Sequence, residues 1–387
     1  MSLCAPGLLF IVNSLEMGGA EKQVVTLLNH LDARRFRLHL AYLKRGERLL
    51  PQLRTDKLAE LLCCDVGRGL QPQAVRRLRR LIAARHIDAI VCTNTYSMLY
   101  GCLAQAWGSA RPKLVTVFHT TLLRSWKEKA QMVLYRWLMR RCDLLVYVCE
   151  NQRRHWRERG VRPAVDAVVH NGIDVDFFAD PHTPEQTLRA RRMLGFGPQD
   201  YVIGLCAALR PEKAHGDLLT AVAKLRARGV PAKALLIGDG PQRQGLEQAT
   251  RQLGLGDHVR ITGLQADVRP LIACCDVMTL VSHAIETFSL AALESMALAK
   301  PLVMTDIGGA SEQVLHGKHG FLFEPGDIGA LVRHLSSLTS PALRAQMGAA
   351  AARRVRQLFT VDAMTDGFTA RLLGLLGGGE SAGEYLT

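Results

Sequence analysis

Short apolar runs of strand length recur along the whole chain and alternate with longer amphipathic stretches. The runs in the first half are Leu8–Val12, Leu38–Leu43, Ile87–Cys92, Leu114–Phe118, Leu144–Val148 and Val165–Val169. The runs in the second half are Val202–Leu205, Ala234–Ile237, Val259–Ile261, Val277–Val281, Leu302–Met304 and Phe321–Phe323. Because they are not alternating, they are typical of strands buried on both faces. Their separation by helical segments predicts parallel sheets covered by helices.

Two sets of about six strands predict an α/β chain with two doubly wound, Rossmann-like domains. A length of 387 residues fits two domains. The pattern breaks at Asn171-Gly172, and we place the domains at 1–178 and 179–362. A last helix is expected over 363–376, followed by a Gly-rich, disordered tail over 377–387. Since doubly wound sheets bind ligands beyond the carboxyl ends of their strands, residues just after each strand are the candidate functional residues.

The net charge of +14 is concentrated in the first half of the chain. Residues 1–180 hold 28 Lys and Arg against 16 Asp and Glu, a balance of +12, whereas residues 181–387 have a balance of +2. Such a basic half is compatible with nucleic acid, with an anionic membrane or with simple solubility. The apolar runs are shorter than the roughly 18–20 residues that span a bilayer, and the N-terminus lacks a signal-peptide pattern. The ten cysteines form no CxxC pair, which predicts reduced thiols in a cytosolic protein and no zinc site.

Two glycines, Gly18 and Gly19, stand between the first predicted strand and the first predicted helix. Bare amides at a helix N-terminus favour an anion, so this turn is a candidate phosphate site. It is not a GxGxxG sequence, and a dinucleotide site is therefore not predicted. A tight turn that needs glycine explains the pair equally well.

Two cations follow the first predicted strand of the second half, in the segment Leu209-Arg210-Pro211-Glu212-Lys213. Arg210 and Lys213 would lie at the carboxyl edge of that sheet. There they could clamp a diphosphate, the arginine by its planar fork and the lysine as a point charge. The alternative is a solvated surface pair, which we weigh equally.

Two glutamates, Glu286 and Glu294, flank a predicted helix start at Ser289. The helix is expected from Leu290 to Ala299 with Ser289 as its N-cap. Glu286 then lies in the preceding loop and Glu294 on the second turn. The neighbours of Glu294 are mostly apolar, and a carboxylate in such surroundings is costly without a partner, which favours a functional role over a surface charge.

These pieces, in this order and spacing, resemble glycosyltransferase family 4, retaining enzymes of the GT-B fold. The resemblance covers nearly the whole chain. Further matching pieces are Val117-Phe118-His119, Val148–Gln152, His170–Asp174, Gly238–Pro241, Val259–Gly263 and Asp306–Gly309. The set in this order is fairly specific, although no single piece is.

The resemblance implies an α/β GT-B chain whose two Rossmann-like domains face one another across a cleft. The first domain would take the acceptor and the second the nucleotide sugar. Gly18 and Gly19 would approach the donor diphosphate, which Arg210 and Lys213 would neutralise. Catalysis would rest on Glu286, His119, Lys213 and Arg210. The donor-binding set would be Gly18, Gly19, Arg210, Lys213, Thr287, Phe288, Ser289, Leu290 and Glu294, with Glu294 on the ribose.

The implied reaction moves a sugar from a nucleoside diphosphate, with UDP favoured over GDP, to a hydroxyl acceptor with retention of anomeric configuration. The expected acceptor is a lipid-linked or cell-surface polysaccharide or lipopolysaccharide precursor. No metal or other cofactor is expected, and Asp174-Val175-Asp176 is interpreted as turn chemistry and helix entry rather than as a metal motif. The family usually places its arginine further from the lysine, at the position of Ala208. A histidine that ends a strand, as His119 does, is also often structural.

A basic, Trp-containing stretch in the first half is a candidate for docking on anionic lipid, with Trp126, Arg136, Trp137, Arg140 and Arg141 as its residues. We therefore expect a cytoplasmic protein at the inner face of the membrane, although a core helix with a solvated basic face is a close alternative. Two other functions compete with the transferase. One is a sugar-nucleotide 2-epimerase of the same fold, which needs no acceptor, and the other is a nucleic-acid-binding protein, for which no recognised module is present.

Overall fold

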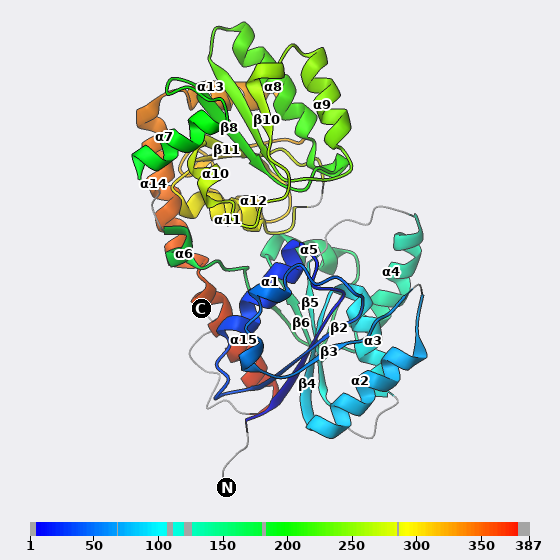
Figure 1. Cartoon of the computed structure of the whole chain (residues 1–387). Helices are drawn as coiled ribbons and strands as arrows, with labels where there is room; N and C mark the ends of the chain where they lie inside the picture. The colour runs from blue at the N-terminus through cyan, green and yellow to red at the C-terminus, as the bar shows by residue number, and fades with distance from the viewer. Residues whose placement is uncertain are drawn as a thin grey trace. The chain divides into compact units, whose positions relative to one another are not determined.

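The computed structural model describes residues 5–67, 69–106, 111–119, 126–179, 183–284 and 286–377, without the side chains of 126–131 and 179. The chain divides into two compact units (Figure 1). Unit 1 consists of Met1–Gly172 and Val361–Thr387, and unit 2 of Ile173–Thr360. The division therefore falls at 172/173, six residues before the predicted boundary, and the predicted tail lies almost wholly outside the described residues.

Unit 1 is built on a seven-stranded sheet in the order β3-β2-β1-β4-β5-β6-β7, with every neighbouring pair parallel. The strands are β1 (Gly7–Val12), β2 (Arg37–Tyr42), β3 (Leu58–Cys63), β4 (Ile87–Thr93), β5 (Lys113–Phe118), β6 (Leu144–Tyr147) and β7 (Asp166–Val168). The chain winds to β2 and β3 on one side of β1 and to β4 onward on the other. The carboxyl end of β1 is therefore the point where the strand order reverses, and such points form ligand sites.

One strand of this sheet, β3, was not predicted. Its sequence, Leu58-Ala59-Glu60-Leu61-Leu62-Cys63, places a glutamate among residues that favour helices. The strand lies at the edge of the sheet and most of its residues are only half-buried. The glutamate interrupts the apolar run, so the rule that identified the other strands did not identify this one.

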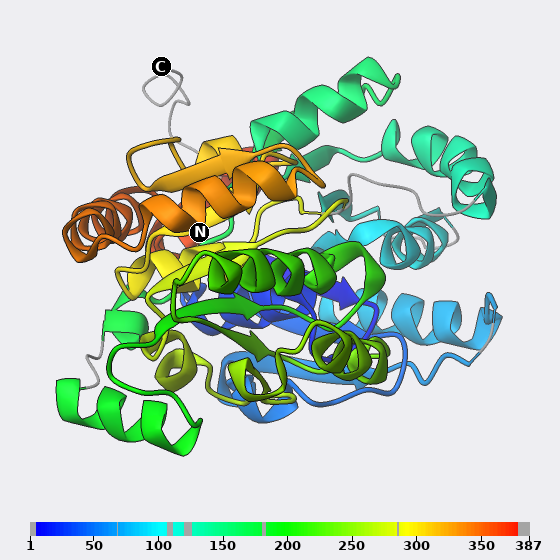
Figure 2. The same ribbon diagram turned by 90° about the horizontal axis from the view of Figure 1, so that it is seen from above.

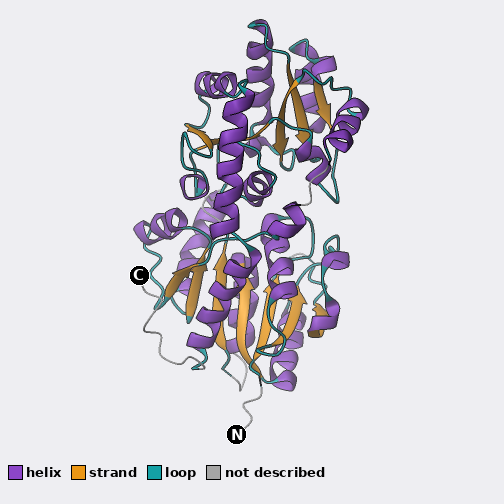
Figure 3. Ribbon diagram, turned by 90° about the vertical axis from the view of Figure 1, so that its left-hand side faces the viewer, coloured by secondary structure: helices purple, strands orange, loops and turns teal. Residues whose placement is uncertain are grey.

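Helices cover both faces of the unit 1 sheet (Figure 3). They are α1 (Gly19–His30), α2 (Pro72–Arg85), α3 (Asn94–Ala106), α4 (Trp126–Met139), α5 (Glu150–Glu158) and α15 (Val361–Leu375). Alternate residues of β1 point to opposite faces: Phe10 packs with α1 and α15, whereas Ile11 packs with α2 and α3. The last helix, α15, thus contributes Met364 and Phe368 to the core of the first unit.

Unit 2 contains a six-stranded parallel sheet in the order β10-β9-β8-β11-β12-β13. The strands are β8 (Tyr201–Cys206), β9 (Ala232–Ile237), β10 (Val259–Ile261), β11 (Val277–Leu280), β12 (Leu302–Thr305) and β13 (Gly320–Phe323). Here the order reverses between β8 and β11. The two sheets confirm the predicted α/β class, with parallel, doubly wound topology in each unit.

The helices of unit 2 are α6 (Val175–Ala179), α7 (Pro184–Met193), α8 (His215–Ala227), α9 (Arg243–Gln252), α10 (Arg269–Ala273), α11 (Leu290–Ala297), α12 (Ala310–Gln313), α13 (Ile328–Ser337) and α14 (Pro341–Leu358). On one face of the sheet, α8 and α13 lie side by side and bury Leu218 and Leu331 in a common core (Figure 2). The entry into α6 confirms the turn predicted at Asp174, whose Oδ1 accepts hydrogen bonds from the amides of Asp176 and Phe177. Within the described residues, no helix is both long enough and apolar enough to cross a membrane.

Candidate active site

Lys213 and Glu286 form an ion pair at the carboxyl edge of the unit 2 sheet. Lys213 ends η3 (Pro211–Lys213), a short 3-10 turn after β8, and Glu286 lies in the loop after β11. Because β8 and β11 are neighbours, the pair lies where the strand order reverses. The two side chains are only 20% and 10% exposed, and the Ser282 hydroxyl donates a second hydrogen bond to the same glutamate oxygen at 3.2 Å.

Hydrogen bonds also connect the loop that carries Glu286 to η3 and to the start of α8. The backbone amide of His283 donates to the carbonyl of Glu212 at 3.1 Å, and His283 Nε2 lies 2.6 Å from Asp217 Oδ2. These contacts hold the loops after β8 and β11 together through both backbone and side chains. The sequence had suggested both segments separately, and the structure shows that they are neighbours.

The residues after Glu286 form the start of α11, as predicted. Ser289 is the N-cap, and its hydroxyl accepts a hydrogen bond from the amide of Ala292 at 3.3 Å. Thr287 and Phe288 are buried beside it. Leu290 and Ala291 carry first-turn amides, which a helix leaves without intrahelical partners and which favour an anion.

A third loop, after β12, supports this segment through contacts that the sequence did not reveal. The side-chain amide of Gln313 donates to the Ser289 carbonyl at 2.8 Å, and its oxygen accepts from the Ser289 amide at 3.1 Å. The amide of Gly309 donates to the carbonyl of Thr287 at 2.7 Å. Because the Ser289 N–H already donates to Gln313, it is not available to bind a donor phosphate. The only sequence signal for this loop was Asp306–Gly309.

The remaining donor residues of unit 2 differ in their surroundings. Glu294 is 4% exposed on the second turn of α11, so it is a buried carboxylate rather than a surface charge. Arg210 is exposed at the N-cap of η3, and within the described residues its side chain makes no hydrogen bond or ion pair. The structure therefore brings Lys213 and Glu286 together and does not add Arg210 to that pair.

In unit 1, the predicted glycine turn and His119 both lie at the carboxyl edge of the sheet. Gly18 caps α1, and a Cβ at Gly19, the first residue of this helix, would have no atom within 4 Å among the described residues. His119 follows β5, and its backbone amide donates to Asn94 Oδ1 at 2.9 Å. Burial lowers the pKa of His119 to about 4, so its imidazole is neutral at pH 7.

The predicted docking residues lie on or just after α4. Trp126 is the first residue of this helix, and its side chain is outside the described residues. Trp137 is 48% exposed, with the Arg141 guanidinium stacked 3.6 Å from its ring centroid. Arg140 is exposed, whereas Arg136 is half-buried and less available than predicted. Val133 and Leu134 add exposed apolar surface to the same helix.

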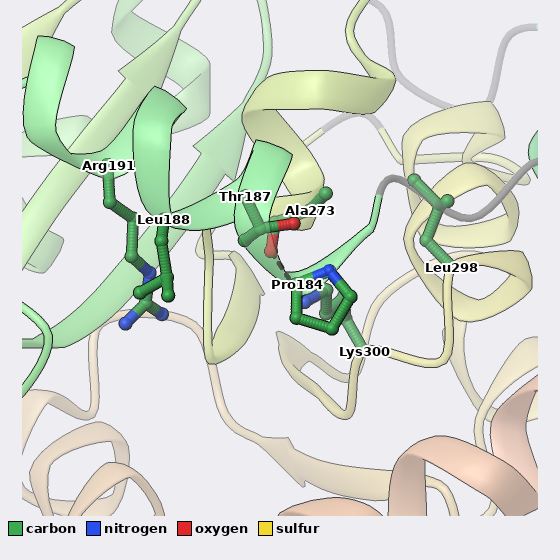
Figure 4. A pocket seen from close by; sticks show the side chains of 7 residues that line it. All are labelled: Pro184, Thr187, Leu188, Arg191, Ala273, Leu298 and Lys300. Carbon is green, nitrogen blue, oxygen red and sulfur yellow. Dashed lines mark hydrogen bonds between the residues drawn. The ribbon is translucent and has the colours of Figure 1, made fainter.

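A pocket of about 510 Å³ elsewhere in unit 2 is lined by α7 together with Ala273, Leu298 and Lys300 (Figure 4). Its two cations are already engaged: Lys300 Nζ donates to the carbonyls of Ala273 and Cys275, and Arg191 pairs with Asp276 at 2.9 Å. None of the predicted donor residues lines this pocket. It therefore does not compete with the Lys213–Glu286 pair as a candidate diphosphate site.

Two family models match the chain and together cover most of it. The model described as Glycosyltransferase Family 4 matches residues 17–177, and the model described as Glycosyl transferases group 1 matches residues 187–354. Their division follows the two units of the structure. The chain belongs to the family 4 type of glycosyltransferases and has the GT-B fold.

Relatives and solved structures agree with this assignment. A Bacillus subtilis protein designated glycosyltransferase EpsD is 26% identical over 307 residues, which cover 76% of this chain and 80% of that protein. The GDP-mannose-dependent alpha-(1-6)-phosphatidylinositol monomannoside mannosyltransferase of Mycolicibacterium smegmatis is 29% identical, over 72% of this chain and 75% of its own length. Anabaena HepE, solved in complex with UDP-glucose, is 25% identical with a TM-score of 0.81, and the match covers 95% of this chain and 99% of HepE.

Proposed function

We propose that this glycosyltransferase moves a sugar from a UDP-sugar to a hydroxyl acceptor with retention of anomeric configuration. The acceptor is a lipid-linked or cell-surface polysaccharide or lipopolysaccharide precursor. The observation that carries the donor proposal is the partly buried Lys213–Glu286 pair at the reversal point of the unit 2 sheet. UDP-glucose in the crystal structure of HepE supports UDP as the nucleotide that carries the donor sugar.

Unit 2 would hold the donor. Breaking the bond between the anomeric carbon and the diphosphate places negative charge on the leaving oxygen, and the Lys213 ammonium would stabilise that charge. Glu286 would then turn from the lysine to hydroxyls of the donor sugar, while Glu294 would accept hydrogen bonds from the ribose. The acceptor oxygen would bond to the same face of the anomeric carbon, and its proton would pass to the leaving phosphate. No metal is expected in this scheme.

Unit 1 would hold the acceptor, with neutral His119 as a hydrogen-bonding group beside the reacting sugar. A neutral imidazole has one donor and one acceptor nitrogen, which suits contact with hydroxyls. Protonation would remove the acceptor. The role predicted for Gly18 and Gly19, contact with the donor diphosphate, also remains part of this proposal.

A thermal-shift screen over nucleotides and nucleotide sugars tests the donor. Ligand at 100 times its Kd stabilises the folded protein by about 2.7 kcal/mol, which is readily measured as a rise in Tm. We expect UDP and one UDP-sugar to raise Tm more than GDP or ADP at the same concentration. Sugar transfer from the stabilising donor should follow. Stabilisation by none of them, or formation of an epimerised sugar nucleotide without acceptor, would contradict the proposal.

Gly19→Ala should weaken donor binding without harming the fold. The new methyl group would have no neighbour among the described residues, and alanine favours the helix over glycine by up to about 1 kcal/mol. If the donor phosphate approaches this backbone, the methyl group will keep it away and raise KM for the donor. Gly245→Ala is the matched control, because Gly245 also lies in the first turn of a helix, α9, where a Cβ would meet only the Gln242 side chain at 3.7 Å. Equal donor KM values for the two variants would exclude contact at Gly19.

The exposed face of α4 is the proposed docking surface for the inner face of the cytoplasmic membrane, with Val133, Leu134 and Trp137 as its apolar part. Each cation near an anionic surface contributes about 1 kcal/mol, so Arg140→Gln with Arg141→Gln should weaken binding to phosphatidylglycerol vesicles about 30-fold. Arg76→Gln with Arg80→Gln removes the same charge from α2, where Leu78 and Leu81 are buried. Co-sedimentation should distinguish the two double variants. If the native protein does not co-sediment with such vesicles, the docking proposal fails while the transferase proposal stands.

A further inference from the structure

Three residues at the reversal point of the unit 1 sheet are linked to one another. Asn13 follows β1, Lys44 follows β2, and Tyr96 lies in the first turn of α3, which follows β4 (Figure 1). The backbone amide of Lys44 donates to the carbonyl of Asn13 at 2.8 Å. The Lys44 ammonium lies 5.1 Å from the centroid of the Tyr96 ring, whose hydroxyl donates to the carbonyl of Gly69 at 3.1 Å. These contacts join the carboxyl ends of three adjacent strands.

Lys44 differs in its electrostatics from the other two cations of the same loop. Arg45 pairs with Asp65 at 2.8 Å, and Arg48 pairs with Glu16 at 3.3 Å. Among the described residues no carboxylate pairs with Lys44, which is exposed and rests on an aromatic face. Contact with the Tyr96 ring holds the ammonium in place without neutralising its charge. This position at the sheet edge therefore presents a positive charge that an anion can reach.

One buried side-chain oxygen next to this contact lacks a hydrogen-bond partner within the described part of the chain. It is Oδ1 of Asn13, the residue whose carbonyl accepts a hydrogen bond from the Lys44 amide. A hydroxyl-bearing ligand would supply the hydrogen bond that this buried oxygen lacks. A positive charge and an unused oxygen thus occur together where doubly wound sheets bind ligands.

We propose that the carboxyl end of the unit 1 sheet binds a polyhydroxylated acceptor that carries an oxyanion, either a phosphate or a carboxylate. Lys44 binds the oxyanion and is held on the face of Tyr96, and Asn13 Oδ1 accepts a hydrogen bond from an acceptor hydroxyl. This inference rests on the proposed function and specifies the acceptor class. It makes Lys44 a specificity-determining residue rather than a catalytic one.

The test measures oxyanion binding through the thermal stability of the full chain. Inorganic phosphate and malonate are titrated separately at constant ionic strength, with saturating UDP present so that the donor site is occupied. We expect at least one of the two anions to stabilise the native protein, and Lys44→Met to weaken that anion about tenfold, the effect of one charge-assisted hydrogen bond. Lys44→Arg should retain most of the binding. Comparison of the two titrations shows which kind of oxyanion is preferred.

Lys113→Met is the matched control, because it removes the same charge from the opposite end of the sheet. Lys113 begins β5 and pairs with Asp143 at 2.9 Å. The inference would be overturned if Lys113→Met weakened anion binding as much as Lys44→Met does. It would also be overturned if Lys44→Met bound the anions as tightly as the native protein, or if neither anion stabilised the native protein. The rise in Tm with UDP alone is measured separately. Absence of this rise would count against the proposed function. Anion binding that depends on Lys44 would still support an oxyanion site in unit 1.

Discussion

Lys213→Ala is expected to lower the rate of sugar transfer about 10²–10³-fold, the usual loss when one group that stabilises developing negative charge is removed. The same change leaves Glu286 as a buried carboxylate whose remaining hydrogen-bond donor, among the described residues, is Ser282. A buried charge that has lost its partner is unfavourable, so Tm should fall as well. Steady-state kinetics with the preferred donor and thermal unfolding check these two effects.

Lys224→Ala is the control for loss of a lysine, because Lys224 is exposed near the end of α8. It should leave both kinetics and Tm unchanged. The double variant Lys213→Ala with Glu286→Ala should be inactive yet more stable than Lys213→Ala alone, since it removes the unpaired carboxylate. Transfer rates near those of the native protein for both Lys213→Ala and Glu286→Ala would refute the proposed active site.

Gly308→Ala is expected to abolish donor binding by displacing the Glu286 loop. Gly308 has a φ of +57°, and an added Cβ would lie 1.6 Å from the carbonyl oxygen of Glu286, which no packing tolerates. The loop after β11 must therefore move away from the loop after β12. That movement would strain the hydrogen bonds through which Gly309 and Gln313 hold Thr287 and Ser289. UDP binding and Tm are the measurements.

Gly317→Ala separates the effect of the clash from the effect of backbone strain. Gly317 has a φ of +77°, but a Cβ there would meet no atom within 4 Å among the described residues. It should cost about 1–2 kcal/mol of stability, the penalty for an L-residue in the left-handed region, and leave UDP binding intact. If the two variants bind UDP equally well, the contact between Gly308 and Glu286 does not position the donor site.

Local sequence rules predicted twelve of the thirteen strands found in the described residues, together with the start of α11 at Ser289. They succeeded because burial and N-capping leave short-range patterns. They failed at β3, where Glu60 interrupts the apolar run and the neighbouring residues favour helices. Arg210 and Lys213 were both placed at the carboxyl edge of the sheet because they follow β8, and the structure shows Lys213 paired with Glu286 and Arg210 exposed.

The residues of the candidate site that directly follow strands could be predicted from the sequence. The contacts between different loops could not. Lys213 and Glu286 both follow strands, so their approach at one sheet edge could be expected. The contacts of Gln313 with Ser289 span 24 residues and depend on the path of the loop after β12. Amide side chains are common, and nothing in the sequence distinguishes Gln313 from the others.

The core of the first unit includes side chains from the last helix, α15, among them Met364, Phe368 and Leu372. Unit 2 is continuous from Ile173 to Thr360 and is therefore complete before α15 leaves the ribosome. During translation the second unit can therefore fold first. Until α15 emerges, residues 1–172 keep exposed the apolar surface that this helix covers. A fragment ending before Val361 would keep that surface exposed, so a stable first unit on its own requires α15 joined to residues 1–172.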